Sequence, residues 1–296
     1  MNITALIRAP IDRTQILKAA ASLGILGVGA HSGPRMMATL CNPQVSMREV
    51  VSVISQQPAI YARVLRVANS PYYGQARCIQ SVERALALLG LDAVRGMAAA
   101  ACLDRTMRRG VQSAPIDLSA LVAHSLATAA AAASLARIHH GSLASDAFIG
   151  GLLHNLGIAV QLHLDAPGIN AMIAHRRTDT LREIRALESE HAIVGHEECA
   201  AAIFEAWQLP DSLVAVARHH HDPMAAPESQ RPLAALVNLG ANLALACGST
   251  FTLEPATIER NLQAMTLLGL TEEDLNAIAL ELPERLDELQ SALMDT

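Results

Sequence analysis

Apolar residues recur along most of the chain at the three- and four-residue spacing of amphipathic helices. A stripe over residues 50–54 follows Ser46-Met47-Arg48-Glu49, which has the form of a capping box and predicts a helix start. Pro58 suits the first turn of the next helix, and Gly90 is a typical stop after a helix that Ser81 can cap. No alternating strand pattern interrupts these signals, so the sequence predicts an all-α protein.

Two stretches without a charged residue, Leu118 to Ala136 and Ala147 to Leu164, have the length of membrane spans. Both contain histidine and many small residues, which transfer weakly into lipid. We therefore expect buried helices, the first starting at Asp117 and the second at Ser145, and no membrane partner.

The last segment, from Thr271 to Met294, is acidic and carries leucines along one helical face. Pro283 lies inside it and should kink or split the helix, because proline removes a backbone donor.

These patterns divide the chain into four parts: an N-terminal segment 1–13, a helical subdomain 14–113, a second helical subdomain 114–250 and an acidic helical extension 251–296. The boundary at 113 is the end of a polar, glycine-containing stretch, residues 105–113. Asp92 is the expected N-cap of the helix that precedes this stretch. The expected architecture is a multi-helix bundle in which the two subdomains pack together.

Composition narrows the function. With 51% apolar and 17% charged residues in 296, the chain can bury a large core. Aromatic residues make up only 2%, too few for stacking of single-stranded nucleic acid, and the net charge of −6 argues against a DNA-binding protein. We expect no nucleic-acid partner. Five isolated cysteines and the lack of a signal peptide favour the reducing cytoplasm.

Charge is unevenly distributed. Residues 1–137 hold 14 Lys/Arg against 6 Asp/Glu, a net of +8, whereas residues 271–296 hold 1 against 8, a net of −7. The basic half can face an acidic partner or the acidic end of the same chain.

Histidine gives the main chemical signal, since eleven of the twelve lie at or after His124. Several are on separate predicted helices or at their ends, which is how metal sites in helical bundles are assembled. The alternative is that each is a core histidine bonded to a carbonyl. Of the consecutive triplet at 219–221, at most two can face one pocket, because neighbours on a helix are about 100° apart. The histidines of interest are His124, His154, His191, His219, His220 and His221.

The order of these residues resembles the HD phosphohydrolase superfamily, and more closely the HDOD (HD-related output domain) family of bacterial signalling proteins. The more specific match is N-terminal, over Gln57-Pro58-Ala59, residues 63–68, the loop Asn69-Ser70-Pro71-Tyr72-Tyr73-Gly74, residues 79–85 and residues 88–91. Gly151-Leu152-Leu153-His154-Asn155-Leu156-Gly157 and Trp207-Gln208-Leu209-Pro210 match further on. The resemblance covers roughly residues 14 to 245 and implies that 114–250 is a degenerate HD-like subdomain.

One departure from the superfamily decides the chemistry. Catalytic HD enzymes carry an aspartate after the motif histidine that bridges two metal ions, and this position is Asn155. Asn242 is the nearest equivalent of a second aspartate. A neutral, imidazole-rich pocket could hold one zinc, nickel or iron ion, but it suits magnesium or manganese poorly. We therefore expect no catalytic residue, no cofactor and no metal. The resemblance places a vestigial ligand pocket at His124, His154, Asn155, His191, His219, His220 and Asn242.

The leading functional hypothesis is a non-catalytic, cytoplasmic regulatory module that acts through an unidentified signalling protein. A cluster of arginines is the candidate surface for an acidic partner, although each is also typical of a solvated surface charge. They are Arg63, Arg66, Arg105, Arg108 and Arg109.

Two other hypotheses stay open. The chain could be a metal-dependent phosphohydrolase that acts on a nucleotide or cyclic dinucleotide. The pocket could also bind a small anionic ligand that changes the surface a partner meets.

Overall fold

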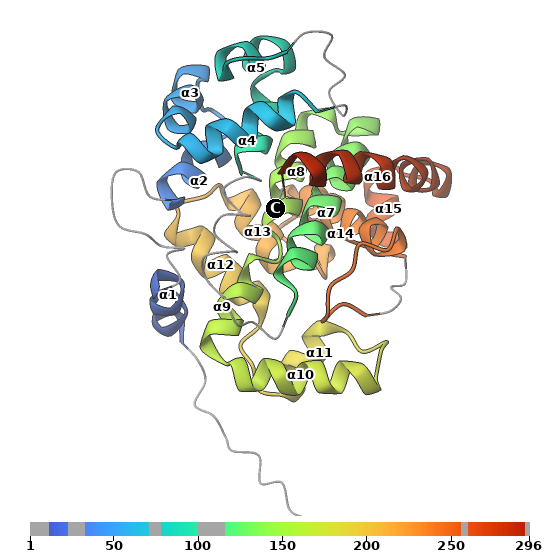
Figure 1. Ribbon diagram of the computed structural model, residues 1–296. Coiled ribbons are helices and arrows are strands. Elements are labelled where there is room, and N and C mark those ends of the chain that lie inside the picture. The colour runs from blue at the N-terminus through green and yellow to red at the C-terminus, as the bar shows by residue number, and fades with distance from the viewer. Residues whose placement is uncertain (1–11, 23–32, 71–77, 100–115, 256–259, 294–296) are drawn as a thin grey trace, which may run out of the picture.

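The computed structural model describes residues 12–22, 33–70, 78–99, 116–255 and 260–293, and this part of the chain is helical without strands, as predicted. Figure 1 shows the helices of residues 33–89 grouped at one end of the molecule and those of residues 166–190 at the opposite end. The N-terminal helices are α1 (Arg13–Ser22), α2 (Gly33–Cys41), α3 (Met47–Ser55), α4 (Pro58–Ala68), α5 (Val82–Leu89) and a helical run over 91–99. The middle of the chain forms α7 (Leu118–His139), α8 (Ala144–Leu153), α9 (Leu156–Leu164), α10 (Ala166–Thr178) and α11 (Ile184–Glu190). The remainder forms α12 (His196–Ala206), α13 (Asp211–His219), α14 (Arg231–Ala246), α15 (Leu262–Leu268) and α16 (Glu272–Leu293), with short 3₁₀ turns at Gly141–Leu143, Pro223–Ala225 and Glu228–Gln230.

The predicted helix ends are largely confirmed. Ser46 and Glu49 form both bonds of the capping box, and Gly90 ends α5 with a φ of 86°. The expectation for Asp92 is wrong, because the helical run begins at residue 91 and Asp92 pairs with Arg95 one turn later. The α8 helix begins at Ala144 instead of Ser145, since a 3₁₀ turn leads into it.

The centre of the fold is the alanine-rich α7, which packs against α8 and α14. Small residues permit this contact. A Cβ at Gly151 would lie 2.8 Å from the backbone of Ala129, and one at Gly240 would lie 2.8 Å from the carbonyl of Thr128. Two segments are long and apolar enough to cross a membrane, Leu118–His139 and Gly141–Leu164, and 72% of an 18-residue apolar stretch in each is buried in the fold. They are core helices of this bundle, as the sequence predicted.

A second close contact joins α9 to α12. A Cβ on Gly157 would lie only 1.9 Å from the carbonyl oxygen of His196, the first residue of α12. Glycine at this position therefore fixes how near His196 can come to α9.

The helix of the C-terminal extension contacts both the central helices and the N-terminal group. The acidic α16 packs along α7 and also contacts α4 of the N-terminal group, which places it across both parts (Figure 1). Pro283 does not split the helix, because α16 runs from Glu272 to Leu293 with the proline inside it. Proline leaves the carbonyl of Ala279 without its usual helical donor. The thiol of Cys247 donates to that carbonyl at 3.4 Å and replaces part of the lost bond.

The predicted division of the chain into four parts stays a prediction. Its boundary stretch, residues 105–113, lies outside the described residues.

We expect Gly157→Ala to lower the free energy of unfolding by about 3 kcal/mol or more, because the new methyl group overlaps a main-chain oxygen. Chemical denaturation followed by circular dichroism measures this change. Gly141→Ala is the matched control, since nothing lies within 4 Å of a Cβ there. Equal stability of the two variants would contradict the proposed contact.

Candidate functional site

Five histidine rings form a continuous chain through the interior. The centroid distances are 5.5 Å from His124 to His154, 5.0 Å from His154 to His220, 5.2 Å from His220 to His196 and 5.1 Å from His196 to His221. The rings come from α7, the end of α8, the end of α13 and the start of α12. The first four residues are buried and His221 is half-buried.

Three of the rings are oriented by main-chain carbonyls. Each donates its Nδ1–H, which leaves Nε2 as the lone-pair nitrogen. The acceptors are the carbonyl of Ser249 for His124 at 2.7 Å, of Gly151 for His154 at 2.6 Å, and of Val216 for His220 at 3.2 Å.

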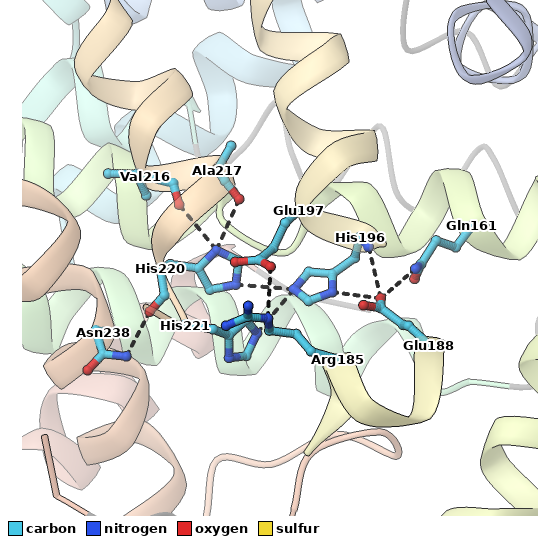
Figure 2. Close-up of polar contacts among 10 residues, drawn as sticks. All are labelled: Gln161, Arg185, Glu188, His196, Glu197, Val216, Ala217, His220, His221 and Asn238. Atoms are coloured by element: carbon cyan, nitrogen blue, oxygen red, sulfur yellow. Dashed lines mark hydrogen bonds and ion pairs between the residues drawn. The ribbon is translucent and has the colours of Figure 1, made fainter. Parts of the chain in front are cut away.

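His196 is oriented by a buried carboxylate (Figure 2). Oε1 of Glu188 accepts 2.8 Å hydrogen bonds from both Nδ1 and the backbone N–H of His196. The side-chain amide of Gln161 donates to the same oxygen at 2.5 Å and to the carbonyl of Val194 at 2.6 Å. These bonds direct Nε2 of His196 toward the rings of His220 and His221, each of whose Nε2 atoms lies 3.2 Å away.

Burial and neighbouring charges shift the pKa values of these histidines in different directions. Burial lowers the pKa of His154, His220 and His221 well below the usual value, and neighbouring histidines add to the effect. Burial also opposes charge on His196, but the charge and hydrogen bond of Glu188 outweigh it and raise its pKa. The pKa of Glu188 is lowered, because His196 outweighs the effect of burial. The pKa directions therefore favour charge on the His196–Glu188 pair and neutral rings at the other three histidines.

Further carboxylates border the cluster, so the pocket is not the neutral one expected from the sequence. Oε1 of Glu254 lies 3.8 Å from Nε2 of His124, and both side chains are almost fully buried. Glu197 pairs with Arg185 at 3.3 Å, and burial raises the pKa of Glu197.

The segment that carries Glu254 closes over the His124 end. Phe251 packs against the His124 ring at a centroid distance of 5.5 Å. The buried guanidinium of Arg176 donates two hydrogen bonds to the carbonyl of Leu253, at 2.7 and 3.2 Å. The first residues of the extension 251–296 thus form part of the pocket wall.

Of the seven pocket residues expected from the sequence, the structure joins His124, His154 and His220 in the ring chain. It places His191 elsewhere, against His175 at 3.2 Å, because α11 ends at Glu190 and the chain turns before His196 begins α12. His219 is half-buried and makes no described ring contact with the cluster.

The expected Asn242 is half-buried on α14 and has no described bond to the cluster. Asn238, one helical turn earlier, is buried and donates to the carbonyl of His220 at 2.7 Å. Asn155 is buried next to His154, and its Nδ2 has no hydrogen-bond partner among the described residues.

The expected N-terminal sites are only partly described. Asn69 ends α4 and bonds both the N–H and the carbonyl of Ile79, so it fixes the chain between α4 and α5. Ser70 is buried, Arg63 is half-buried and Arg66 is exposed. The other expected residues lie outside the described residues: Pro71, Tyr72, Tyr73, Gly74, Arg105, Arg108 and Arg109.

Three Nε2 atoms converge tightly enough to hold a metal ion. The ligand atoms of His196, His220 and His221 all lie within 4.8 Å of one another. Imidazole nitrogen suits zinc, nickel, iron or copper, and the bond from His196 to Glu188 is the type of outer-shell contact that orients metal-bound histidine. The donor set therefore fits one transition-metal ion.

Sequence reasoning missed Glu188, His196, Asn238 and Glu254. His196 stands just before an apolar helix, and this is the signal in the sequence that could have identified it. His191 stands five residues earlier, before the turn, and carries an equally strong signal. Glu254 had no local signal, since it reaches the pocket across 130 residues of sequence from His124.

Comparison with known proteins gives a family match and several similar folds. The model of the HDOD domain family matches residues 31–223. An uncharacterized protein of Treponema pallidum (strain Nichols) is 27% identical over 197 residues, which are 66% of this chain and 37% of that protein. The chain thus spans little more than a third of that relative.

Two crystal structures share the fold. An HDOD domain protein of Geobacter sulfurreducens has a TM-score of 0.72 at 20% identity, covering 95% of this chain and 97% of its own. A candidate signal transduction protein of Marinobacter aquaeolei VT8 has a TM-score of 0.74 at 22% identity, covering 99% of this chain and 68% of its own.

We expect the free energy of unfolding, measured with EDTA present, to fall as the pH is lowered from 7.5 to 5.5. His154, His220 and His221 have lowered pKa values in the folded protein, so below about pH 6.5 the unfolded chain binds more protons. Each group contributes at most about 1.4 kcal/mol per pH unit below that point. His196 acts in the opposite direction, since its raised pKa stabilises the fold at low pH, but it is one group against three.

Urea denaturation at several pH values checks this dependence. His154→Asn should make the dependence less steep, because one of the three groups is removed, whereas His139→Asn, at an exposed position, should leave it unchanged. A stability that does not fall with acidity would show that the buried rings are not neutral.

Proposed function

Because this chain belongs to the HDOD domain family, we propose that it is a non-catalytic regulatory module that acts through a protein partner in a bacterial signalling pathway of the cytoplasm. Its histidine pocket serves as a ligand-sensing site. HDOD membership supports the regulatory, HD-related character of the module, and the remaining statements rest on the residues of the pocket.

The observation that carries the proposal is Asn155. A two-metal hydrolase needs an anionic bridge between its ions, and an amide at the bridging position is neutral. Glu188 already accepts three N–H donors, and Glu197 pairs with Arg185. Both carboxylates are thus already engaged by other side chains of the chain.

The packing supports a route from the pocket to the surface. His196 begins α12, which contacts α1, and His124 lies on α7, which contacts α16. The α16 helix also contacts α4, the helix of Arg63 and Arg66. A change at the pocket can therefore alter how the N-terminal helices are held, and we propose this group as the partner-binding side.

A phosphohydrolase acting on a nucleotide or cyclic dinucleotide is the second candidate. It is favoured by Glu254, which supplies a carboxylate 3.8 Å from His124 even though Asn155 does not. A small anion as the sensed ligand is favoured by the unpaired Nδ2 donor of Asn155, which is buried beside His154.

We expect no hydrolysis of bis(p-nitrophenyl) phosphate or of cyclic dinucleotides above a metal-only blank, with zinc, manganese or iron(II) supplied, because the site lacks a bridging carboxylate. Product release is followed by absorbance and chromatography. The matched control is His154→Ala, which should give the same background rate. Turnover by the native chain that this variant loses would favour the phosphohydrolase.

A further inference from the structure

We propose that the pocket binds a single transition-metal ion of the zinc class through Nε2 of His196, His220 and His221, with Glu188 as the positioning residue. This inference rests on the proposed function, in that it names the ligand of the same pocket. It shares only His220 with the residues that the superfamily order predicts.

Two of the three distances between the ligand nitrogens match the edges of a metal tetrahedron, and the third is within 4.8 Å. Zinc–nitrogen bonds of about 2.0–2.1 Å in tetrahedral geometry place two ligand nitrogens about 3.3–3.4 Å apart. Nε2 of His196 lies 3.2 Å from Nε2 of His220 and 3.2 Å from Nε2 of His221 (Figure 2). An ion can therefore enter with small movements of the rings.

Two of the three ligands are held in place before any ion binds. His220 is fixed by the carbonyls of Val216 and Ala217 at its Nδ1, at 3.2 and 3.3 Å, while Asn238 holds its main-chain oxygen. His196 is fixed at Nδ1 by Glu188. Since these bonds occupy the Nδ1 atoms, only the Nε2 atoms are available to an ion.

Glu188 orients one ligand, and the three imidazole ligands make the site selective for an ion that prefers nitrogen. A carboxylate bonded to the far nitrogen of a histidine fixes its orientation and raises its basicity toward the metal. Three imidazoles suit zinc, cobalt, nickel or iron(II), whereas magnesium and manganese prefer oxygen ligands. Asn155 is not one of the three ligands. Because the site holds a single ion, it needs no bridging carboxylate.

The first test is metal content and affinity of the full-length chain, purified without a histidine tag. We expect about one zinc per chain by elemental analysis, and a visible absorption spectrum typical of tetrahedral coordination when cobalt(II) replaces it. His221→Asn should lose the ion and the spectrum. The matched control is His219→Asn, two residues earlier and outside the cluster, which should retain both.

The second test addresses Glu188. We expect Glu188→Gln to weaken zinc affinity by 10- to 100-fold, as loss of an outer-shell partner typically does. Glu190→Gln on the same helix should have no such effect, because Glu190 pairs with Arg182. Thermal unfolding of the metal-free variants shows whether each is folded. His221 is half-buried and Glu188 is buried, so we expect His221→Asn to disturb the fold less than Glu188→Gln does.

Native protein that binds no zinc at micromolar free metal, or binding that survives in folded His221→Asn, would overturn the metal site. A folded Glu188→Gln variant with unchanged affinity would overturn the role of Glu188. If the native protein neither binds zinc nor hydrolyses phosphoesters, the metal site is refuted and the regulatory proposal still stands. A bound zinc that supports hydrolysis would instead confirm the site and refute the non-catalytic function.

Discussion

Close backbone contact between helices is the constraint on which the rest of the structure depends. The α7 helix reaches α8 and α14 only because Gly151 and Gly240 present no side chain at the contact, and α9 reaches α12 only through Gly157. Helices this close need small residues where they meet, and the buried residues of α7 are accordingly mostly alanine. The same contacts bring histidines from four elements within ring contact of one another.

Once the rings are buried, their hydrogen bonds determine their chemistry. A buried imidazole without a partner is costly, and main-chain carbonyls at helix ends meet this requirement for His124, His154 and His220. His196 is different, because the acceptor for its Nδ1–H is the buried carboxylate of Glu188 and not a main-chain carbonyl. The pocket therefore contains one histidine–carboxylate pair, and the Nε2 atoms of His220 and His221 each lie 3.2 Å from Nε2 of His196.

The sequence predicted the all-α class, most helix caps and the part of the site that depends on helix order, including His124 and His154. It could not distinguish His196 from His191, because five residues and a tight turn through Ala192, at a φ of 53°, decide which faces inward. Asn238 and Asn242 differ by one helical turn, so helical periodicity alone fits both. Glu254 depends on a contact with His124, 130 residues earlier in the chain, which local patterns do not encode. Helices and their ends are local properties, whereas a site is set by how helices rotate against one another.

The match to the family model ends at residue 223, but the pocket does not. Asn238 on α14 holds the main-chain oxygen of His220, and the segment from Ser249 to Glu254 covers His124. This segment follows α14 directly, and Cys247 at the end of that helix donates to Ala279 in the middle of α16. Pro283 makes that carbonyl available, so the same residue that weakens α16 also joins it to the pocket wall. In a regulatory module, such a connection links the occupancy of a buried site to a helix that also contacts α4, without requiring any hydrolytic step.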